Sequence, residues 1–258
     1  MQMIDFFDNF AFWGDARKSK FLNRLRLYSS VRLLVVVITN VLLPIYFKLT
    51  AKRSENKIVS SRSNIGVRYI VSLTTFPLRI GKVYLVIESM LRQKCKPDKI
   101  ILYLSKEQFS GLSDLPKNLL SLQDRGLQIE LVDGDMRSHK KYLYAMRQFP
   151  KDNIITIDDD VIYRSDFIQS FVEMSKKFPH CIIGNRCKVT SSSKDYCYNH
   201  MRDAKNEDAL VPREDLLSIG ASGVLYPPDA LFEDFDNEIL IKKCVSLQMI
   251  FGCISWQK

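Results

Sequence analysis

Residues 153–160 read NIITIDDD, an apolar run that ends in three consecutive aspartates. The β-branched residues in this run are typical of a buried strand, and the carboxylates follow where such a strand would end. In open α/β sheets, ligands bind beyond the carboxyl ends of the strands. This stretch therefore predicts a central strand with a polar site at its end.

Similar apolar runs lie upstream of this stretch and alternate with helical patterns. We expect strands at residues 68–73, 99–105 and 127–133. Apolar residues recur at helical spacing from Val83 to Leu91, and residues 139–149 are also expected to be helical. Strands that alternate with helices predict an α/β fold with a mainly parallel central sheet.

The composition describes a globular chain able to bury one substantial core. Of its 258 residues, 46% are hydrophobic and 26% are charged. The six cysteines show no Cys-x-x-Cys spacing and the three histidines form no close pair, so neither a zinc site nor a disulfide framework is indicated. We interpret the cysteines as reduced thiols of a cytosolic domain. Motifs typical of dinucleotide-binding and P-loop proteins are absent from the sequence.

The net charge of +9 is concentrated in the first quarter of the chain. Residues 1–66 carry eleven Lys and Arg against four Asp and Glu, which is +7 of the total. The remainder is nearly neutral, and this distribution argues against a nucleic-acid partner. A nuclease or a phosphotransferase could also use clustered aspartates, but a nuclease would be expected to carry positive charge beside the site.

Residues 1–50 are predicted to associate with an anionic membrane surface. The apolar run from Val31 to Phe47 is shorter than the ~20 residues of a spanning helix and contains Pro44. Basic residues flank the run on both sides, which favours a helix that lies in the membrane interface. Each Lys or Arg near such a surface adds about 1 kcal/mol of attraction. The alternative is a buried helix of the main domain.

The rest of the chain is expected to form a linker and one domain. Residues 51–66 are polar and serine-rich, as linkers commonly are. The main domain then spans residues 67–258, with an atypical tail at 244–258. The expected location is the cytoplasmic face of the inner membrane, as a peripheral protein, or the cytoplasm.

The aspartate run has the chemistry of a divalent metal site. In a locally extended backbone, Asp158 and Asp160 would point to the same side. Such a pair suits Mg²⁺ or Mn²⁺, which commonly completes its shell with substrate phosphates and water. The alternative is an acidic turn or a helix N-cap, because both also produce runs of aspartate.

Four ordered blocks between Tyr69 and Cys244 resemble bacterial glycosyltransferases related to family 2, of the type encoded among capsule and surface-polysaccharide genes. The blocks are VSLTTFPLRI, QKCKPDKIILYLS, RGLQIELVDGDMRSHKKYLYAMRQFPKDNIITIDDDVIY and IGASGVLYPP. The resemblance implies a GT-A fold that binds a nucleotide-diphosphate sugar with Mn²⁺ or Mg²⁺ through Asp158 and Asp160. It also implies transfer of the sugar to a hydroxyl group of a glycan or lipid-linked acceptor.

The resemblance further implies which residues contact the two substrates. Those expected to contact the nucleotide sugar are Ser72, Thr74, Thr75, Arg79, Asp135, Lys141 and Asp159. Those expected on the acceptor side are Arg186, Gly220, Ser222 and Gly223. Simpler alternatives stay open, namely a polar strand-to-helix turn, an ordinary helix surface, a solvated arginine and a glycine turn that needs positive φ.

The catalytic base that the resemblance implies is missing from the sequence. It is expected in an Ala-Asp-Asp-Ile-Trp motif downstream of GVLYPP, whereas the chain ends in VSLQMIFGCISWQK. A shifted reading frame from the last base of the Met249 codon gives GAT, an aspartate. With permitted codons, the whole stretch from Leu247 to Lys258 then becomes Ala-Asp-Asp-Ile-Trp-Leu-Tyr-Lys-Leu-Ala-Lys.

We therefore hypothesise a frameshift near Cys244 to Leu247 that truncates the catalytic domain and impairs turnover. The coding DNA tests this hypothesis directly, because only certain codon choices permit the shifted motif. The alternative function is a non-catalytic remnant or a nucleotide-sugar binder.

Overall fold

The computed structural model describes the core of the chain and several segments beside it. The described residues are 41–51, 57–58, 67–189, 202–205, 211–213, 215–220, 222–231, 235 and 237. The predictions for residues 1–40, for most of the linker and for the tail at 244–258 lie outside the described residues.

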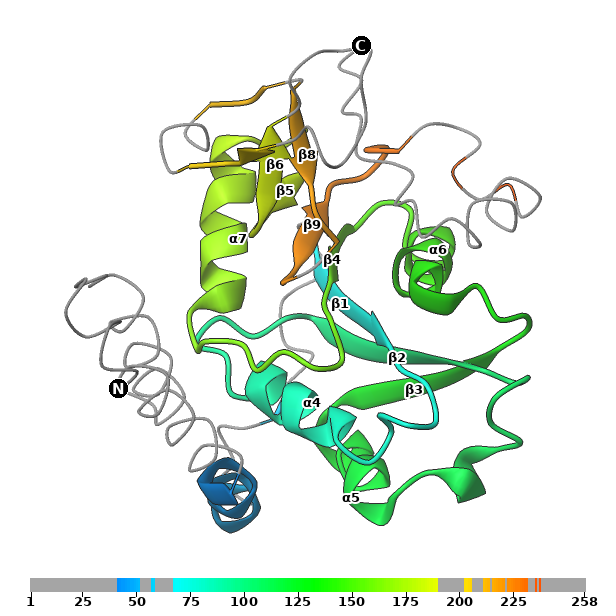
Figure 1. The fold of residues 1–258 in the computed structure, drawn as a ribbon. Helices are drawn as coiled ribbons and strands as arrows, with labels where there is room; N and C mark the ends of the chain where they lie inside the picture. Colours follow the sequence, from blue (N-terminus) through cyan, green and yellow to red (C-terminus); the bar gives the residue numbers. More distant parts are fainter. Residues whose placement is uncertain are drawn as a thin grey trace, which may run out of the picture.

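A six-stranded sheet with the order β3-β2-β1-β4-β9-β5 forms the centre of the fold (Figure 1). Four adjacent strands are parallel: β1 (Tyr69–Thr74), β2 (Lys99–Ser105), β3 (Leu127–Val132) and β4 (Asn153–Thr156). β9 (Val224–Tyr226) pairs antiparallel with β4, and β5 (Ile183–Gly184) pairs antiparallel with β9. The predicted α/β fold with a mainly parallel sheet is confirmed.

Helices cover both faces of this sheet. α4 (Val83–Leu91) and α7 (Phe167–Lys177) contribute to the larger apolar core, which includes Val71 of β1. α6 (Lys140–Gln148) contributes to a second cluster with Ile70, the neighbour of Val71 in the same strand. Because side chains alternate along a strand, a sheet covered on both faces needs apolar residues at successive positions.

Shorter elements complete the described fold. α5 (Lys117–Leu120) lies between two 3-10 helices, Leu112–Asp114 and Gln123–Arg125, and a further 3-10 helix, Arg137–His139, leads into α6. A separate sheet has the antiparallel order β7-β6-β8, formed by Arg202–Asp203, Cys187–Val189 and Leu216–Ser218. Two cysteines in the described part of the chain, Cys181 and Cys187, are free thiols.

The order of the parallel strands reverses between β1 and β4. The chain moves from β1 to β2 and then to β3 in one direction, whereas β4 returns to the other side of β1. Loops that leave neighbouring strands at such a switch point diverge, and ligands bind in the crevice between them. The loops in question begin at Thr75, after β1, and at Ile157, after β4. The fold therefore brings the first resemblance block beside the aspartate run.

Residues 41–50 form a helix that packs on the body of the protein. Leu43 and Phe47 are buried and contact Leu85 and Ile162. Arg92 donates hydrogen bonds to the Phe47 carbonyl at 3.1 Å and to Thr50 Oγ1 at 2.8 Å. The inner face of this helix thus belongs to the domain core, which was the alternative that the sequence left open.

The described part of the chain contains no helix that is long and apolar enough to cross a membrane. Within the predicted linker, the Ile58 N–H donates to the Arg125 carbonyl at 3.0 Å, and the Ile58 side chain packs against the main core. The described part of this segment is therefore attached to the domain.

Candidate functional site

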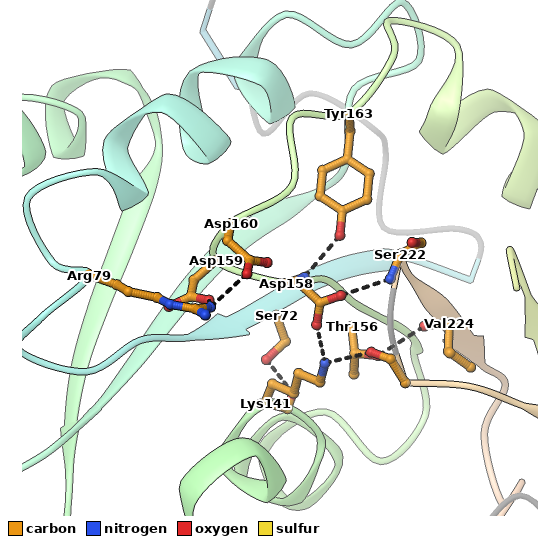
Figure 2. A network of polar contacts seen from close by, with 11 residues as sticks. Ser72, Arg79, Lys141, Thr156, Asp158, Asp159, Asp160, Tyr163, Ser222 and Val224 are labelled. Carbon is orange, nitrogen blue, oxygen red and sulfur yellow. Dashed lines mark hydrogen bonds and ion pairs between the residues drawn. The ribbon is translucent and has the colours of Figure 1, made fainter. Parts of the chain in front are cut away.

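Asp158 joins three parts of the fold at the end of β4 (Figure 2). Its Oδ1 accepts a hydrogen bond from Lys141 Nζ at 2.8 Å, and its Oδ2 accepts one from the Ser222 N–H at 2.7 Å. The Asp158 N–H donates to the hydroxyl of Tyr163 at 2.9 Å. These bonds connect β4 to α6 and to the loop that precedes β9.

Asp159 and Asp160 share a single guanidinium group. Arg79 Nη1 donates to Asp159 Oδ1 and to Asp160 Oδ2, and both distances are 2.8 Å. The second oxygen of Asp159 accepts a hydrogen bond from Thr75 Oγ1 at 2.6 Å. The Asp159 side chain is only 10% exposed, whereas those of Arg79 and Asp160 are 45% and 52% exposed. Asp160 is thus the carboxylate that a dissolved ion or ligand reaches most directly.

The backbone of the aspartate run differs from the expectation. Asp159 and Asp160 lie in a turn, so the locally extended backbone that was expected through Asp160 is corrected. Asp158 and Asp160 consequently bind different partners, Lys141 and Arg79. The physical reason is that the strand pairing of β4 stops at Thr156, after which no ladder holds the chain extended.

Lys141 connects β1 and the residues after β4 with the loop before β9. Its Nζ donates to the Gly220 carbonyl at 2.8 Å as well as to Asp158, and its own carbonyl accepts from the Ser72 hydroxyl. The Lys141 side chain is 12% exposed. Residues that were predicted from separate sequence blocks are therefore members of one network (Figure 2).

The charges of this network stabilise one another. The hydrogen bond with Asp159, followed by the charge of that carboxylate, raises the pKa of the Arg79 guanidinium. Arg79 therefore stays protonated beside the aspartates. Burial raises the pKa of Tyr163, so its hydroxyl stays neutral and accepts the Asp158 N–H.

Two residues expected near the nucleotide have other partners. The Thr74 hydroxyl donates to the Tyr103 carbonyl at 2.8 Å, across to β2. Asp135 accepts hydrogen bonds from Gln108 Nε2 at 2.7 Å, from the Arg137 N–H at 3.0 Å and from Lys140. Burial acts to raise the pKa of Asp135, but the bonds from Lys140 and Arg137 outweigh it and lower the pKa.

Of the four residues expected on the acceptor side, two belong to the network around Asp158 and Lys141. Gly220 and Ser222 join it through their backbones. Gly223 has a φ of 104°, and a Cβ at this position would lie 2.5 Å from the ring of Phe167. Arg186 is exposed, and its carbonyl accepts from the Ile219 N–H at 2.9 Å. For Gly223, the turn with positive φ explains the glycine.

Tyr163 is the site residue that sequence reasoning did not single out. It is buried, holds the backbone of Asp158 and packs on Phe167 with ring centroids 4.3 Å apart. The sequence carried a weak signal, because Tyr163 ends the same block DDDVIY as the aspartates. Only the turn at residues 159–160 brings its hydroxyl back to Asp158.

The carboxylates at the end of β4 are of the chemical type that a hard divalent cation binds. Carboxylate oxygens are preferred ligands of Mg²⁺, which usually needs one or two of them together with substrate phosphates. Each oxygen of an ionised carboxylate has more than one lone pair, so Asp158 and Asp160 can accept beyond their present bonds. Within the described ranges, no group of three or more His, Cys, Asp or Glu side chains could hold a metal.

The fold and the site define an α/β protein whose sheet has, at its switch point, a site of aspartate side chains paired with Arg79 and Lys141. No protein-family model and no curated protein matches the chain. Among solved structures, it is similar to CMP:2-keto-3-deoxy-manno-octonic acid synthetase complexed with CTP. The TM-score is 0.39 and the identity 12%, covering 70% of this chain and 83% of that chain.

UDP-glucose pyrophosphorylase is also similar in two structures. The apo form has a TM-score of 0.36 and 11% identity, covering 67% of this chain and 80% of that chain. The complex with UDP-glucose has a TM-score of 0.34 and 11% identity, covering 64% of this chain and 78% of that chain. At these TM-scores and identities, the similarities assign no activity to this chain.

Proposed function

We propose that this protein is a glycosyltransferase of the GT-A type, which moves a sugar from a nucleotide-diphosphate donor to a hydroxyl group of a glycan or lipid-linked acceptor. The observation that carries the proposal is the meeting of the β1 and β4 loops at the switch point. Arg79 and Thr75 from the first loop bind Asp159 and Asp160 from the second. Cations and carboxylates are thus gathered where a diphosphate with its metal would bind.

Under this proposal, Asp158 and Asp160 hold Mn²⁺ or Mg²⁺. A cation bound there supplies positive charge to the diphosphate leaving group. Lys141 keeps Asp158 in place through its second bond to the Gly220 carbonyl. Arg79 offers a planar, charged donor of the kind that recognises phosphate oxygens well.

Donor turnover tests this proposal. The full chain is incubated with a panel of nucleotide sugars and Mn²⁺, and hydrolysis and transfer to candidate acceptors are measured. We expect turnover of at least one donor, and a loss of roughly 100-fold or more in the Asp160→Asn variant, because a metal ligand is removed. The matched control is Asp124→Asn, since Asp124 is exposed and precedes β3 at the opposite end of the sheet.

The remaining outcomes separate the alternative functions. Binding of nucleoside diphosphate and Mn²⁺ without turnover would favour the non-catalytic nucleotide-sugar binder. Binding of DNA in place of a nucleoside diphosphate would favour another metal-dependent enzyme. Equal turnover in the Asp160→Asn and Asp124→Asn variants would contradict the role of the aspartate run.

We also propose that the outer face of the helix at residues 41–50 contacts an anionic membrane surface. The exposed apolar residues Val41, Ile45 and Leu49 follow one another at a spacing of four, so they share one side of the helix. Lys48 is exposed as well, and residues 1–66 account for +7 of the net charge of +9. A basic helix with such a face suits the cytoplasmic face of the inner membrane.

A further inference from the structure

The Arg79 guanidinium places a positive charge directly on the exposed carboxylate of the site. One nitrogen, Nη1, lies 2.8 Å from an oxygen of Asp160 and 2.8 Å from an oxygen of Asp159 (Figure 2). A divalent cation that binds Asp160 requires carboxylate oxygens at short distance and repels a neighbouring guanidinium. Arg79 and a metal ion therefore compete for Asp160.

The other cation of the network, Lys141, is held far more firmly. Its side chain is 12% exposed and is bound at once to Asp158 and to the Gly220 carbonyl. The Arg79 side chain is 45% exposed, and its ring contact is with Phe76, 5.3 Å from the centroid. Of the two cations, Arg79 is therefore the one that can change partner at little cost.

The backbone of Arg79 is fixed, so only its side chain has to move. The Arg79 N–H donates to the Phe76 carbonyl at 2.9 Å, and its carbonyl accepts from the Lys82 N–H at 2.9 Å. The turn leads directly into α4. Rotation about the side-chain torsions can carry the guanidinium from Asp160 to another acceptor without moving the loop. Asp159 keeps a partner meanwhile, because Thr75 binds its other oxygen.

We propose that Arg79 is a displaceable counter-ion of Asp160. A divalent cation that binds Asp160 releases the guanidinium, which then binds the diphosphate of the donor. The inference rests on the proposed function and deepens it, because it couples metal binding to diphosphate recognition through one residue. Removal of the Arg79 charge should thus have opposite effects on the two ligands.

The test measures Mn²⁺ binding to the full chain without donor, from the electron paramagnetic resonance signal of the free ion. We expect the Arg79→Gln variant to bind Mn²⁺ about two- to fivefold more tightly. This factor corresponds to the free energy that an exposed ion pair typically contributes. The matched control is Lys82→Gln, which removes an exposed charge from the same turn and should leave binding unchanged.

The second measurement is the binding of nucleoside diphosphates at saturating Mn²⁺. It uses isothermal titration calorimetry with UDP, GDP, CDP and ADP in turn. For the nucleotide that the parent chain binds most tightly, we expect Arg79→Gln to bind about tenfold more weakly, because a charge-assisted bond is lost. Circular dichroism and thermal unfolding serve as the check that both variants are folded.

Three outcomes would overturn the inference. If the parent binds Mn²⁺ and Arg79→Gln binds it equally or more weakly, Arg79 does not compete and only this inference fails. If Lys82→Gln tightens Mn²⁺ binding as much as Arg79→Gln, a general charge effect explains the result. If the parent binds neither Mn²⁺ nor any nucleoside diphosphate, the proposed function fails as well.

Discussion

Gly223 illustrates how one residue can meet a backbone requirement inside a candidate site. Its φ of 104° is a conformation that glycine adopts freely and other residues rarely do. It also lies against Phe167 of α7, where a Cβ would be 2.5 Å from the ring. Ser222, whose N–H binds Asp158, is the preceding residue and has a φ of 68°. The turn at Ser222 and Gly223 therefore sets the geometry of the Asp158 network.

The Gly223→Ala variant should lose stability because it combines an unfavourable φ with overpacking. We expect a loss of about 2–4 kcal/mol in the free energy of unfolding, measured with urea. Gly81→Ala is the control, because a Cβ there has nothing within 4 Å, and its effect should stay within ~0.5 kcal/mol. A second substitution, Phe167→Leu, should recover part of the loss in Gly223→Ala. Equal stability of the two alanine variants would contradict this account.

At the scale of the elements, a buried ion-pair network attaches the helix at residues 41–50 to α4. Glu88 accepts from Arg92 Nε at 3.1 Å and from Arg125 Nη2 at 3.0 Å, and all three side chains are buried. Arg92 also lies 4.6 Å from the ring centroid of Phe47 and donates to the carbonyl of that residue. A cation at the last carbonyls of a helix is favourable, so Arg92 stabilises both the pair and the helix end.

Removal of Arg92 should release this helix from the body. The Arg92→Met variant keeps an apolar side chain of similar length, but the buried charge of Glu88 then has Arg125 without Arg92 beside it. We expect the free energy of unfolding to fall by about 3 kcal/mol. Lys106→Met is the control, because Lys106 and Asp133 form an exposed pair that is worth at most ~1 kcal/mol. Urea unfolding measures the loss, and faster amide hydrogen exchange at residues 41–50 should accompany it. A lower free energy of unfolding without faster exchange at residues 41–50 would show that the network stabilises the body but does not hold this helix to it.

Element positions were largely predictable from the sequence. The strand expected at residues 99–105 is β2 with the same limits, and the helical spacing from Val83 to Leu91 coincides with α4. The helix expected at residues 139–149 is α6, which a 3-10 helix precedes from Arg137. These agreements arise because apolar periodicity is a local property of the chain. The turn at Asp159 and Asp160 was not predictable in the same way, because it follows from where the pairing of β4 ends.

At the scale of the whole molecule, one helix has two apolar faces, one buried against the body and one exposed. Leu43 and Phe47 face the body, whereas Ile45 and Leu49 are exposed, Leu49 by 78%. Apolar side chains left in water beside basic residues are the pattern of a membrane-binding face. The contacts with the body fix the orientation of this outer face relative to the domain.

Vesicle co-sedimentation tests the outer face. We expect the full chain to bind phosphatidylcholine vesicles more tightly when they contain phosphatidylglycerol, and Ile45→Asp to weaken that binding about tenfold, since an apolar contact is lost and a repelled charge added. Leu112→Asp is the control, because Leu112 is an exposed leucine of a 3-10 helix elsewhere in the chain. Binding that depends on neither the anionic lipid nor Ile45 would contradict the membrane proposal.

The sequence by itself determined the α/β class, the positions of the parallel strands and the presence of three aspartates after β4, because periodicity and strand ends are encoded locally. The partner of each carboxylate was decided only by the tertiary structure. Arg79 lies 80 residues from Asp159 and Lys141 lies 79 residues from Gly220. No local pattern encodes these pairs. The first arises from the reversal of strand order between β1 and β4, and the second from the position of α6 beside the loop that precedes β9. Likewise, the apolar run at Phe47 suited both a membrane and a core, and its contact with Arg92 placed its inner face in the domain.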